Sequence, residues 1–199
     1  MNFWFFCFKT KEQINPNKHL MKNISLKHYT RLRDTLEYDL ILEHLKPKNS
    51  FGGKQMNPHI MPYANVKYCI RLLPKITDWN GVLQLFEICF DIDEKTFWKA
   101  SVTEFFAARK FVVEEFGRII ATENKLLATL STDSHLWDMA GADKLKAYSD
   151  TLPLLQLGKQ FGQYPFDLGR KPYSEIFSLL AQTKAQNEVE NEYRKISRQ

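Results

Sequence analysis

The residues of this sequence that could carry chemistry are scattered, and their spacing assembles no familiar catalytic or metal-binding motif. Asp91, Asp93 and Glu94 form a small group of carboxylates, but the further ligands and the central glycine of a calcium-binding loop are missing. We interpret this group as a solvated junction between helices. None of the five histidines stands at the i, i+4 spacing of a helical metal site, so each is interpreted as a surface or loop residue: His19, His28, His44, His59 and His135.

Two other candidates for chemistry also have a simpler explanation. The segment Gly52–Lys54 (GGK) lacks the GxxxxGK[ST] spacing of a phosphate-binding loop, so we expect a flexible loop there. Cys89 lies in an apolar run, where a thiol is usually inert core. With Cys7 and Cys69 it shows no CxxC spacing, which argues against a disulfide framework or a zinc site. The sequence therefore predicts no enzyme, no cofactor and no metal.

The composition predicts a folded protein with an uneven distribution of charge. The chain has 199 residues, of which 44% are hydrophobic and 26% are charged, values typical of one globular domain with extensions. The net charge is +5, but residues 1–77 hold 13 Lys and Arg against 5 Asp and Glu. Such asymmetry can mark contact with nucleic acid. The basic residues stand singly, however, so we keep nucleic-acid binding only as an alternative.

The N-terminal segment is apolar but short. Its opening MNFWFFCF has no leading positive charge and meets Lys9 after eight residues, too few for a signal peptide or a membrane span. Met21 begins a second plausible start, so residues 1–20 are expected to be a disordered tail or a start-site extension. We accordingly predict a cytoplasmic protein without a membrane segment.

Residues 21–65 are expected to form a basic N-terminal arm. Apolar residues spaced three or four apart predict an amphipathic helix from about Leu26 to Leu45. Three prolines and two adjacent glycines predict a loop over 46–65, which separates the arm from the body. The following segment, Asn65–Leu73, could be a strand on propensity alone.

A helical body is expected over residues 66–180. Asp78 can cap a helix over 79–90 whose buried face holds Val82, Leu83, Phe86, Cys89 and Phe90. Ser101–Glu104 is a capping-box sequence that begins a helix running to about Leu130. The apolar stripe of that helix comprises Phe105, Val112, Phe116, Ile119 and Ile120, with Phe106 and Val113 alongside.

The C-terminal part should hold two further helices. Asp150 can cap a short helix that Gly162 ends. Pro172 is placed as the first residue of the last helix, whose buried seam is formed by Tyr173, Ile176, Phe177 and Leu180. Beyond Ala181 only Val189, Tyr193 and Ile196 are apolar, so residues 181–199 are expected to be an exposed helical tail. The fold class is mainly α: a compact helical domain with an N-terminal helical arm and an extended C-terminal helix.

A succession of short motifs in the C-terminal third resembles a known family. The motifs are Trp137–Leu145 (WDMAGADKL), then Leu152–Gly158, then Lys171–Phe177 (KPYSEIF) leading into a polar helix. Together they resemble the tail assembly chaperones of long-tailed bacteriophages, in which a compact helical domain precedes a Pro-Tyr segment and a charged helix. The resemblance covers residues 76–199. The basic arm and the Pro-rich loop depart from the family's usual pattern.

The resemblance implies a function in binding, without catalysis. Members of that family coat the aggregation-prone helices of the tape measure protein before the tail tube forms, and they commonly self-associate. The tape measure protein would then be the partner, met in the host cytoplasm. The residues carried over as partner-binding are Pro172, Tyr173, Ile176, Phe177, Val189, Tyr193 and Ile196. Ordinary helix packing is the simpler explanation for Ile176 and Phe177. Deleting residues 182–199 is expected to leave the body folded and to weaken partner capture.

Two alternatives remain beside this interpretation. One is a nucleic-acid-binding accessory protein that uses the basic N-terminal arm, and the other is a different helical adaptor or virion component. A titration with DNA at two salt concentrations tests the first, because phosphate contacts give a steep salt dependence. A long helical reading frame immediately downstream would favour the chaperone over the generic adaptor.

Overall fold

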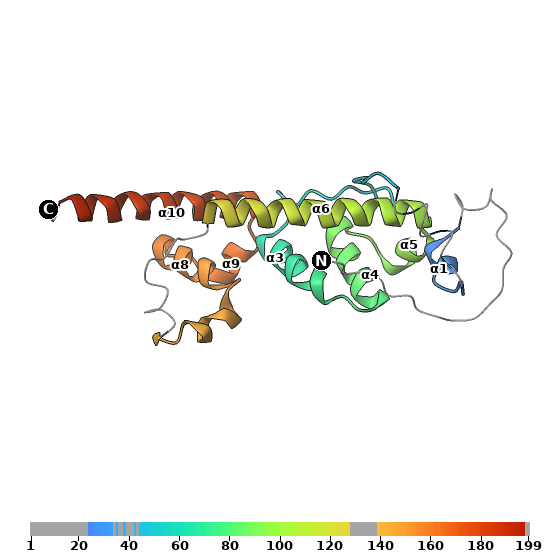
Figure 1. Ribbon diagram of the computed structural model, residues 1–199, viewed down its shortest axis with the longest axis horizontal. Coiled ribbons are helices and arrows are strands. Elements are labelled where there is room, and N and C mark those ends of the chain that lie inside the picture. The colour runs from blue at the N-terminus through green and yellow to red at the C-terminus, as the bar shows by residue number, and fades with distance from the viewer. Residues whose placement is uncertain are drawn as a thin grey trace. The chain divides into compact units, whose positions relative to one another are not determined.

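The computed structural model describes residues 24–33, 35, 38, 42, 44–127 and 139–197. Within these ranges the regular secondary structure is helical throughout, which confirms the expectation of a mainly α fold (Figure 1). The expected extension over residues 1–20 and the first part of the Trp137–Leu145 motif lie outside the described residues.

The chain divides into two compact units. The first comprises Met1–Asn57 with Cys69–Arg118, and the second comprises Pro58–Tyr68 with Ile119–Gln199. The divisions fall inside the helices α3 (Tyr63–Leu72) and α6 (Val102–Leu127). This differs from the single body expected over residues 66–180, because the apolar residues of these helices contribute to two separate cores.

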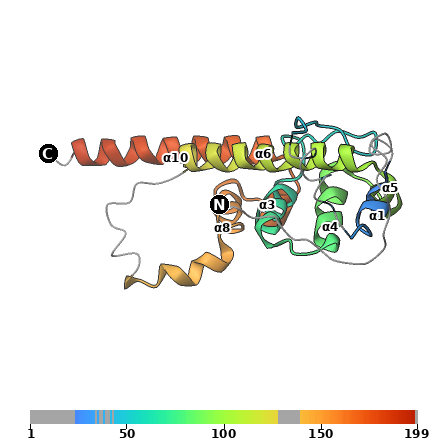
Figure 2. The ribbon, with the colours of Figure 1, turned by 45° about the vertical axis from the view of Figure 1, so that its right-hand side comes forward.

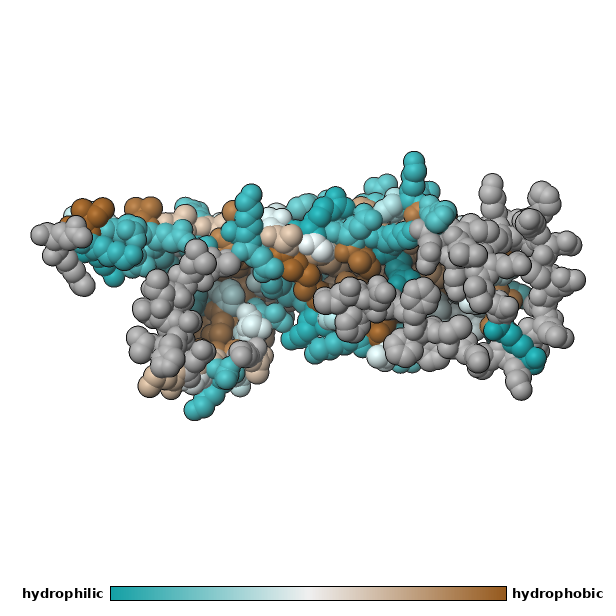
Figure 3. All heavy atoms as spheres, in the orientation of Figure 1, coloured by the Kyte–Doolittle hydropathy of each residue, from teal (hydrophilic) through white to brown (hydrophobic). Residues whose placement is uncertain are grey.

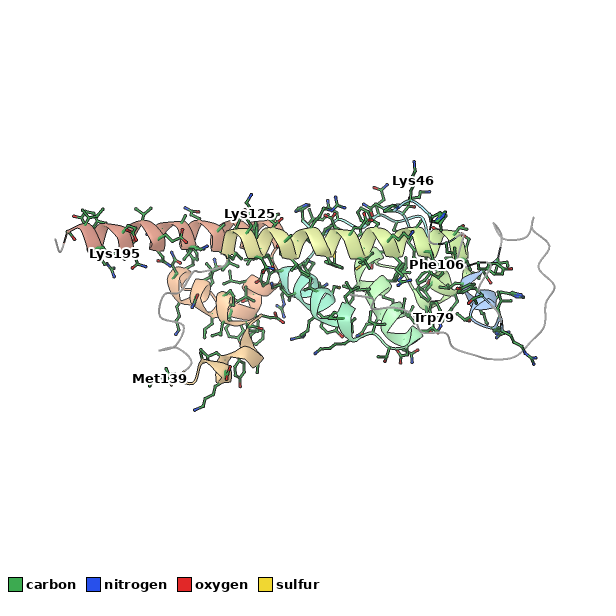
Figure 4. The ribbon with its side chains drawn as sticks, in the orientation of Figure 1. Lys46, Trp79, Phe106, Lys125, Met139 and Lys195 are labelled. Carbon is green, nitrogen blue, oxygen red and sulfur yellow. The ribbon has the colours of Figure 1, made fainter. Side chains whose placement is uncertain are left out.

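The first unit is built around a cluster of aromatic rings. Among the described residues, its complete helices are α1 (Leu26–Tyr29), η2 (Leu73–Lys75), α4 (Trp79–Phe90) and α5 (Glu94–Lys99). Phe51 is fully buried, and its ring lies 4.7 Å from that of Phe86, measured between centroids. The rings that also surround Phe51, at centroid distances up to 6.3 Å, belong to Phe90, Phe97 and Phe105. Figure 4 shows Trp79 at the start of α4 and Phe106 on α6. Aromatic packing therefore provides much of the core of this unit.

The loop expected over 46–65 is observed as far as Pro62, where α3 follows, but the part that holds Phe51 is packed in the core and is not flexible. Phe51 and Lys54 exchange two backbone hydrogen bonds, of 2.9 and 3.0 Å, around a two-residue turn. Gly52 and Gly53 occupy that turn at φ of 58° and 76°, values that glycine adopts without steric cost. Met56 is buried as well, and its backbone exchanges two 2.8 Å hydrogen bonds with the Asn49 side chain. The loop is thus a part of the first core.

Two helix starts in the first unit follow the sequence signals. The Asp78 carboxylate accepts a 2.8 Å hydrogen bond from the Gly81 amide, and α4 has the bounds expected for it. Its buried face includes Leu85 where Leu83 was expected. Ser101 accepts from the Glu104 amide at 3.2 Å, as the capping-box sequence predicted. The Glu104 carboxylate, however, accepts a 2.9 Å hydrogen bond from the Gly52 amide, so the second half of the capping box is replaced by a contact with the turn.

The amphipathic helix expected from Leu26 to Leu45 is not continuous: α1 ends after one turn at Tyr29, and among the described residues that follow, Tyr38 and Leu42 are again helical. Long-range backbone hydrogen bonds instead fix where α1 begins. The Leu26 amide donates to the Ala100 carbonyl at 2.8 Å, and the Val102 amide donates to the Ile24 carbonyl at 3.0 Å. These bonds fix the chain on both sides of residue 25, a constraint that local periodicity cannot reveal.

The strand considered for Asn65–Leu73 was also wrong, because Asn65–Leu72 belong to α3 and Leu73 begins η2. Tyr63, Val66 and Cys69 are buried, and their spacing of three residues is that of one helical face. A half-buried strand would instead have buried alternate residues. The β-branched and aromatic residues here were a misleading signal of propensity.

The second unit contains the remaining helices, which are η3 (Ala142–Tyr148), α8 (Leu152–Phe161), α9 (Pro165–Gly169) and α10 (Tyr173–Ile196). Within it, α8 packs against α9 and against α10 (Figures 1 and 2). Gly162 ends α8 at φ of 63°, as expected. Asp150 is not the cap of α8, because the helix begins one residue later and Thr151 is its N-cap. The buried side chains of this unit are Tyr63, Val66, Ile119, Leu154, Leu157, Leu168, Tyr173 and Ile176.

Candidate protein-binding helix

The start of α10 is fixed to the segment that precedes α3. Pro172 was expected to be the first residue of α10, but it is the N-cap, and the helix begins one residue later at Tyr173. The Tyr173 amide donates to the Met61 carbonyl at 2.8 Å, and the Ser174 amide donates to the His59 carbonyl at 3.0 Å. The Tyr63 amide donates in turn to a carbonyl just before Pro172, at 2.9 Å. The first turn of α10 therefore has a single position within the second unit.

A polar network lies beneath this first turn. The Tyr173 hydroxyl donates to one oxygen of the Glu123 carboxylate at 3.0 Å, and the Lys67 ammonium contacts the other oxygen at 2.8 Å. The ring of Tyr173 is stacked between those of Tyr63 and Phe177, at centroid distances of 6.0 and 5.7 Å. Glu123 is thus a carboxylate with a partner on each oxygen, which offsets the cost of removing it from water.

The surroundings of the two buried tyrosines keep their hydroxyls neutral. Burial raises the pKa of Tyr63 and of Tyr173 well above the usual range, and the negative charge of Glu123 raises both further. A phenolate would lie beside a carboxylate out of contact with water. The network consequently favours holding α10 in place over transferring protons.

The seven residues expected to bind a partner separate into two groups. Tyr173 and Ile176 are buried within the second unit, and Pro172 and Phe177 are half-buried. Packing within the unit therefore accounts for this first group, as the sequence analysis favoured for Ile176 and Phe177. The side chains of the second group are about 70% exposed: Val189, Tyr193 and Ile196.

The distal half of α10 maintains its helix with its own side chains. Lys184 pairs with Glu188 at 3.3 Å, Arg194 with Glu190 at 3.7 Å, and Lys195 with Glu192 at 2.6 Å. These are i, i+3 and i, i+4 pairs, which stabilise a helix by a few tenths of a kcal/mol each. Figure 4 shows Lys195 near the C-terminal end of α10. The exposed helix can thus persist without burying its apolar side chains.

The three exposed apolar side chains of α10 lie on one face. Residues 189, 193 and 196 are spaced four and three apart, which places them within an arc of about 60° on a helix of 3.6 residues per turn. Figure 3 shows hydrophobic atoms standing among hydrophilic ones near the C-terminal end of α10. This spacing is the pattern by which an amphipathic helix enters a partner's groove.

The second unit also exposes an aromatic group that the sequence analysis missed. Phe161 ends α8, Tyr164 precedes α9, and Phe166 lies in its first turn, all three with large exposed fractions. The rings of Tyr164 and Phe166 are 5.4 Å apart. The sequence could have predicted this exposed group, because three aromatic residues stand close together in a short segment that contains glycine and proline. Such a segment offers little surface against which to bury them.

Large exposed hydrophobic side chains are concentrated in one part of the protein. Among the described residues, every one of them except Val113 belongs to the second unit. Clusters of this kind typically mark surfaces that bind other proteins. The second unit is therefore the candidate for a protein-binding surface.

The candidates for chemistry have structural roles where the structure describes them. The Asp93 carboxylate caps α5, and its hydrogen bond with the Thr96 side chain holds the pKa of that carboxyl below its usual range. Lys54 binds the carboxylate of Asp91 at 2.6 Å and its backbone carbonyl as well. The described histidines are exposed: His28, His44 and His59.

Two features of the first unit are apolar. Cys69 and Cys89 are buried free thiols, and the hydrogen bond between them, together with burial, raises the pKa of Cys89. A small hollow between α4 and α6, of about 10 Å³, is lined by residues such as Val82, Phe86 and Val112. A space of that size holds no more than about one water molecule. Over the described ranges, no three His, Cys, Asp or Glu side chains are grouped as a metal site would require.

Comparisons with known proteins identify no relative of this chain. No family model, no curated protein and no solved structure matches it. Within the described part of the chain, no helix combines the length and the apolar character needed to cross a membrane.

Proposed function

We propose that this chain is a non-catalytic, protein-binding protein that captures its partner on the distal half of α10. The observation that carries the proposal is the exposure of Val189, Tyr193 and Ile196 on one face of α10. Over the described residues, the hydrogen bonds that join α10 to α8 and to the end of α6 come from Thr183, which donates to Gln160, and Lys184, which donates to the Leu126 carbonyl.

The energetics favour a partner for this stripe. Burying a large apolar side chain contributes about 2 kcal/mol, so three of them offer about 6 kcal/mol. Association costs several kcal/mol in lost freedom of motion, so this stripe alone supports binding of moderate strength. Further apolar surface, such as the aromatic group around Tyr164, would strengthen it.

The most specific form of the proposal is a tail assembly chaperone that holds the tape measure protein. The support for it is the resemblance over residues 76–199, together with an exposed helix suited to helical clients. Holding a long helical protein requires many contacts of moderate strength, which a stripe of three side chains can provide and release. Self-association, which the resemblance also implies, would need a surface other than the stripe.

The test compares the full chain with a variant in which the stripe is removed but the helix is kept. Alanine is the strongest helix former, so V189A/Y193A/I196A should leave the helicity unchanged. Capture of the co-expressed tape measure protein should be lost, because about 6 kcal/mol of apolar burial corresponds to roughly four orders of magnitude in affinity. Deleting residues 186–199 should have the same effect, while sparing the Thr183 and Lys184 contacts that a deletion from 182 would remove.

The matched control is N187A/N191A, which changes two exposed polar residues of the same helix. It should bind as the unaltered chain does. Equal capture by the stripe variant and by this control would refute the assignment of the stripe.

The alternatives from the sequence make different predictions. A nucleic-acid-binding protein that uses the basic arm would bind DNA with an affinity that falls steeply as salt increases. Such binding would persist in the stripe variant. A different helical adaptor or virion component would depend on the stripe but would not retain the tape measure protein.

A further inference from the structure

The apolar stripe of α10 is bordered by carboxylates. With 100° per residue, Glu192 and Glu188 lie on one side of the stripe and Glu190 lies on the other, each within about 110° of its centre. All three side chains are well exposed, with fractions of 61, 47 and 64% for residues 188, 190 and 192. A partner that buries the stripe would therefore meet negative charge along both edges.

The basic residues of the same segment lie further from the stripe than the carboxylates do. Lys184, Arg194 and Lys195 are about 130° or more from its centre, and Lys195 lies about 20° beyond Glu188. They pair with the three carboxylates along the helix, but exposed pairs of this kind are weak and can be exchanged for others. The face that a partner would approach thus combines an apolar centre with acidic borders.

We infer that the partner of α10 presents the complementary surface, which is an amphipathic helix whose apolar stripe is bordered by lysine or arginine. This inference rests on the proposed function and adds the chemical character of the partner. A second copy of α10 fits poorly, because pairing two such stripes would bring acidic borders together. Opposite charges at the rim of an interface favour the correct partner, and like charges disfavour the wrong one.

The test uses two synthetic helical peptides of about 18 residues, or five turns. Both carry the same leucine stripe, which is bordered by lysine in one peptide and by glutamate in the other. The full chain has a net charge of +5, so nonspecific attraction favours the glutamate peptide. We expect the lysine peptide to bind about tenfold more tightly at low salt, and the preference to fade as salt increases.

Two variants locate the effect. E188Q/E190Q/E192Q should abolish the preference for lysine while leaving apolar binding, because glutamine keeps a similar helix propensity. The control E87Q/E114Q/E175Q changes the net charge by the same amount elsewhere and should keep the preference. Circular dichroism of each variant checks that the helix content is unchanged.

The outcomes separate the inference from the function on which it rests. Equal binding of both peptides, lost in V189A/Y193A/I196A, would overturn the inference and leave the proposed function standing. Binding of neither peptide would overturn both. Sedimentation that shows a dimer abolished by V189A/Y193A/I196A would assign the stripe to a second copy and so overturn the inference.

Discussion

Replacing Tyr173 with phenylalanine tests the network beneath α10. The substitution removes only the hydroxyl that donates to Glu123 at 3.0 Å, and the stacked ring stays. Hydrogen bonds to charged groups contribute about 1.5–3 kcal/mol. Because Glu123 retains its 2.8 Å contact with Lys67, we expect a loss near the lower end, about 1.5 kcal/mol at pH 8.

The difference between the two proteins should then shrink as the pH rises. Both buried tyrosines have a folded-state pKa above the ordinary value of 10.0, so their contribution to stability is complete below pH 10 and falls at higher pH. Each such tyrosine lowers the free energy of unfolding by about 1.4 kcal/mol per pH unit above 10. Tyr173→Phe retains only Tyr63 and so loses stability half as steeply. The two free energies should meet near pH 11, about one unit above the ordinary value.

Urea unfolding followed by circular dichroism at several pH values between 8 and 11 measures both quantities. Y193F is the control, because Tyr193 is exposed and its substitution should change the free energy of unfolding by less than about 0.5 kcal/mol. A difference between Tyr173→Phe and the unaltered chain that stays constant from pH 8 to 11 would refute the reasoning. Tyr173 would then ionise as freely in the folded protein as in the unfolded one.

Three further predictions concern the first unit and are checked by urea unfolding. Phe51→Ala should destabilise it by about 3–5 kcal/mol, because it empties the centre of the aromatic cluster; a loss below 1 kcal/mol would show that the ring is not part of the core. Gly52→Ala should cost more than Gly53→Ala, since an added Cβ would lie 2.7 Å from the Thr96 methyl at the first position and meets nothing within 4 Å at the second. The reverse order would contradict the described turn. Asp78→Ala should cost about 1 kcal/mol through the lost cap of α4, whereas Asp78→Asn should cost much less.

Local signals were sufficient where a helix is specified by its own residues. The bounds of α4 followed from the Asp78 cap and the apolar periodicity after it. The beginning of α6 followed from Ser101, and the end of α8 from Gly162. In each case a side chain or a glycine close in sequence satisfies the groups at the helix end.

Local sequence signals failed where contacts with residues distant in the sequence determine the local structure. Leu26 donates to Ala100 across more than seventy positions, a contact that fixes the start of α1 and that no local pattern shows. Phe51 lies in a segment with the composition of a loop, yet it occupies the centre of a core. Propensity suggested a strand for α3 because it cannot register which face the fold buries.

The candidate site shows the same division. The apolar points Val189, Tyr193 and Ile196 could be located from the sequence, because too few apolar residues accompany them to cover a helix face. The role of Tyr173 could not, since its partner Glu123 is fifty residues away. The carboxylate borders of the stripe could have been read from helical geometry, but only after the helix was known to continue to Ile196.

The burial of Phe51 also limits how the chain can be shortened. A fragment that starts at α3 would lack the two-glycine turn, leaving the rings of Phe86, Phe97 and Phe105 open to water on one side. Such exposed aromatic surface promotes aggregation. The smallest independently stable version of the first unit should therefore retain the two-glycine turn before α3, although that turn belongs to no helix.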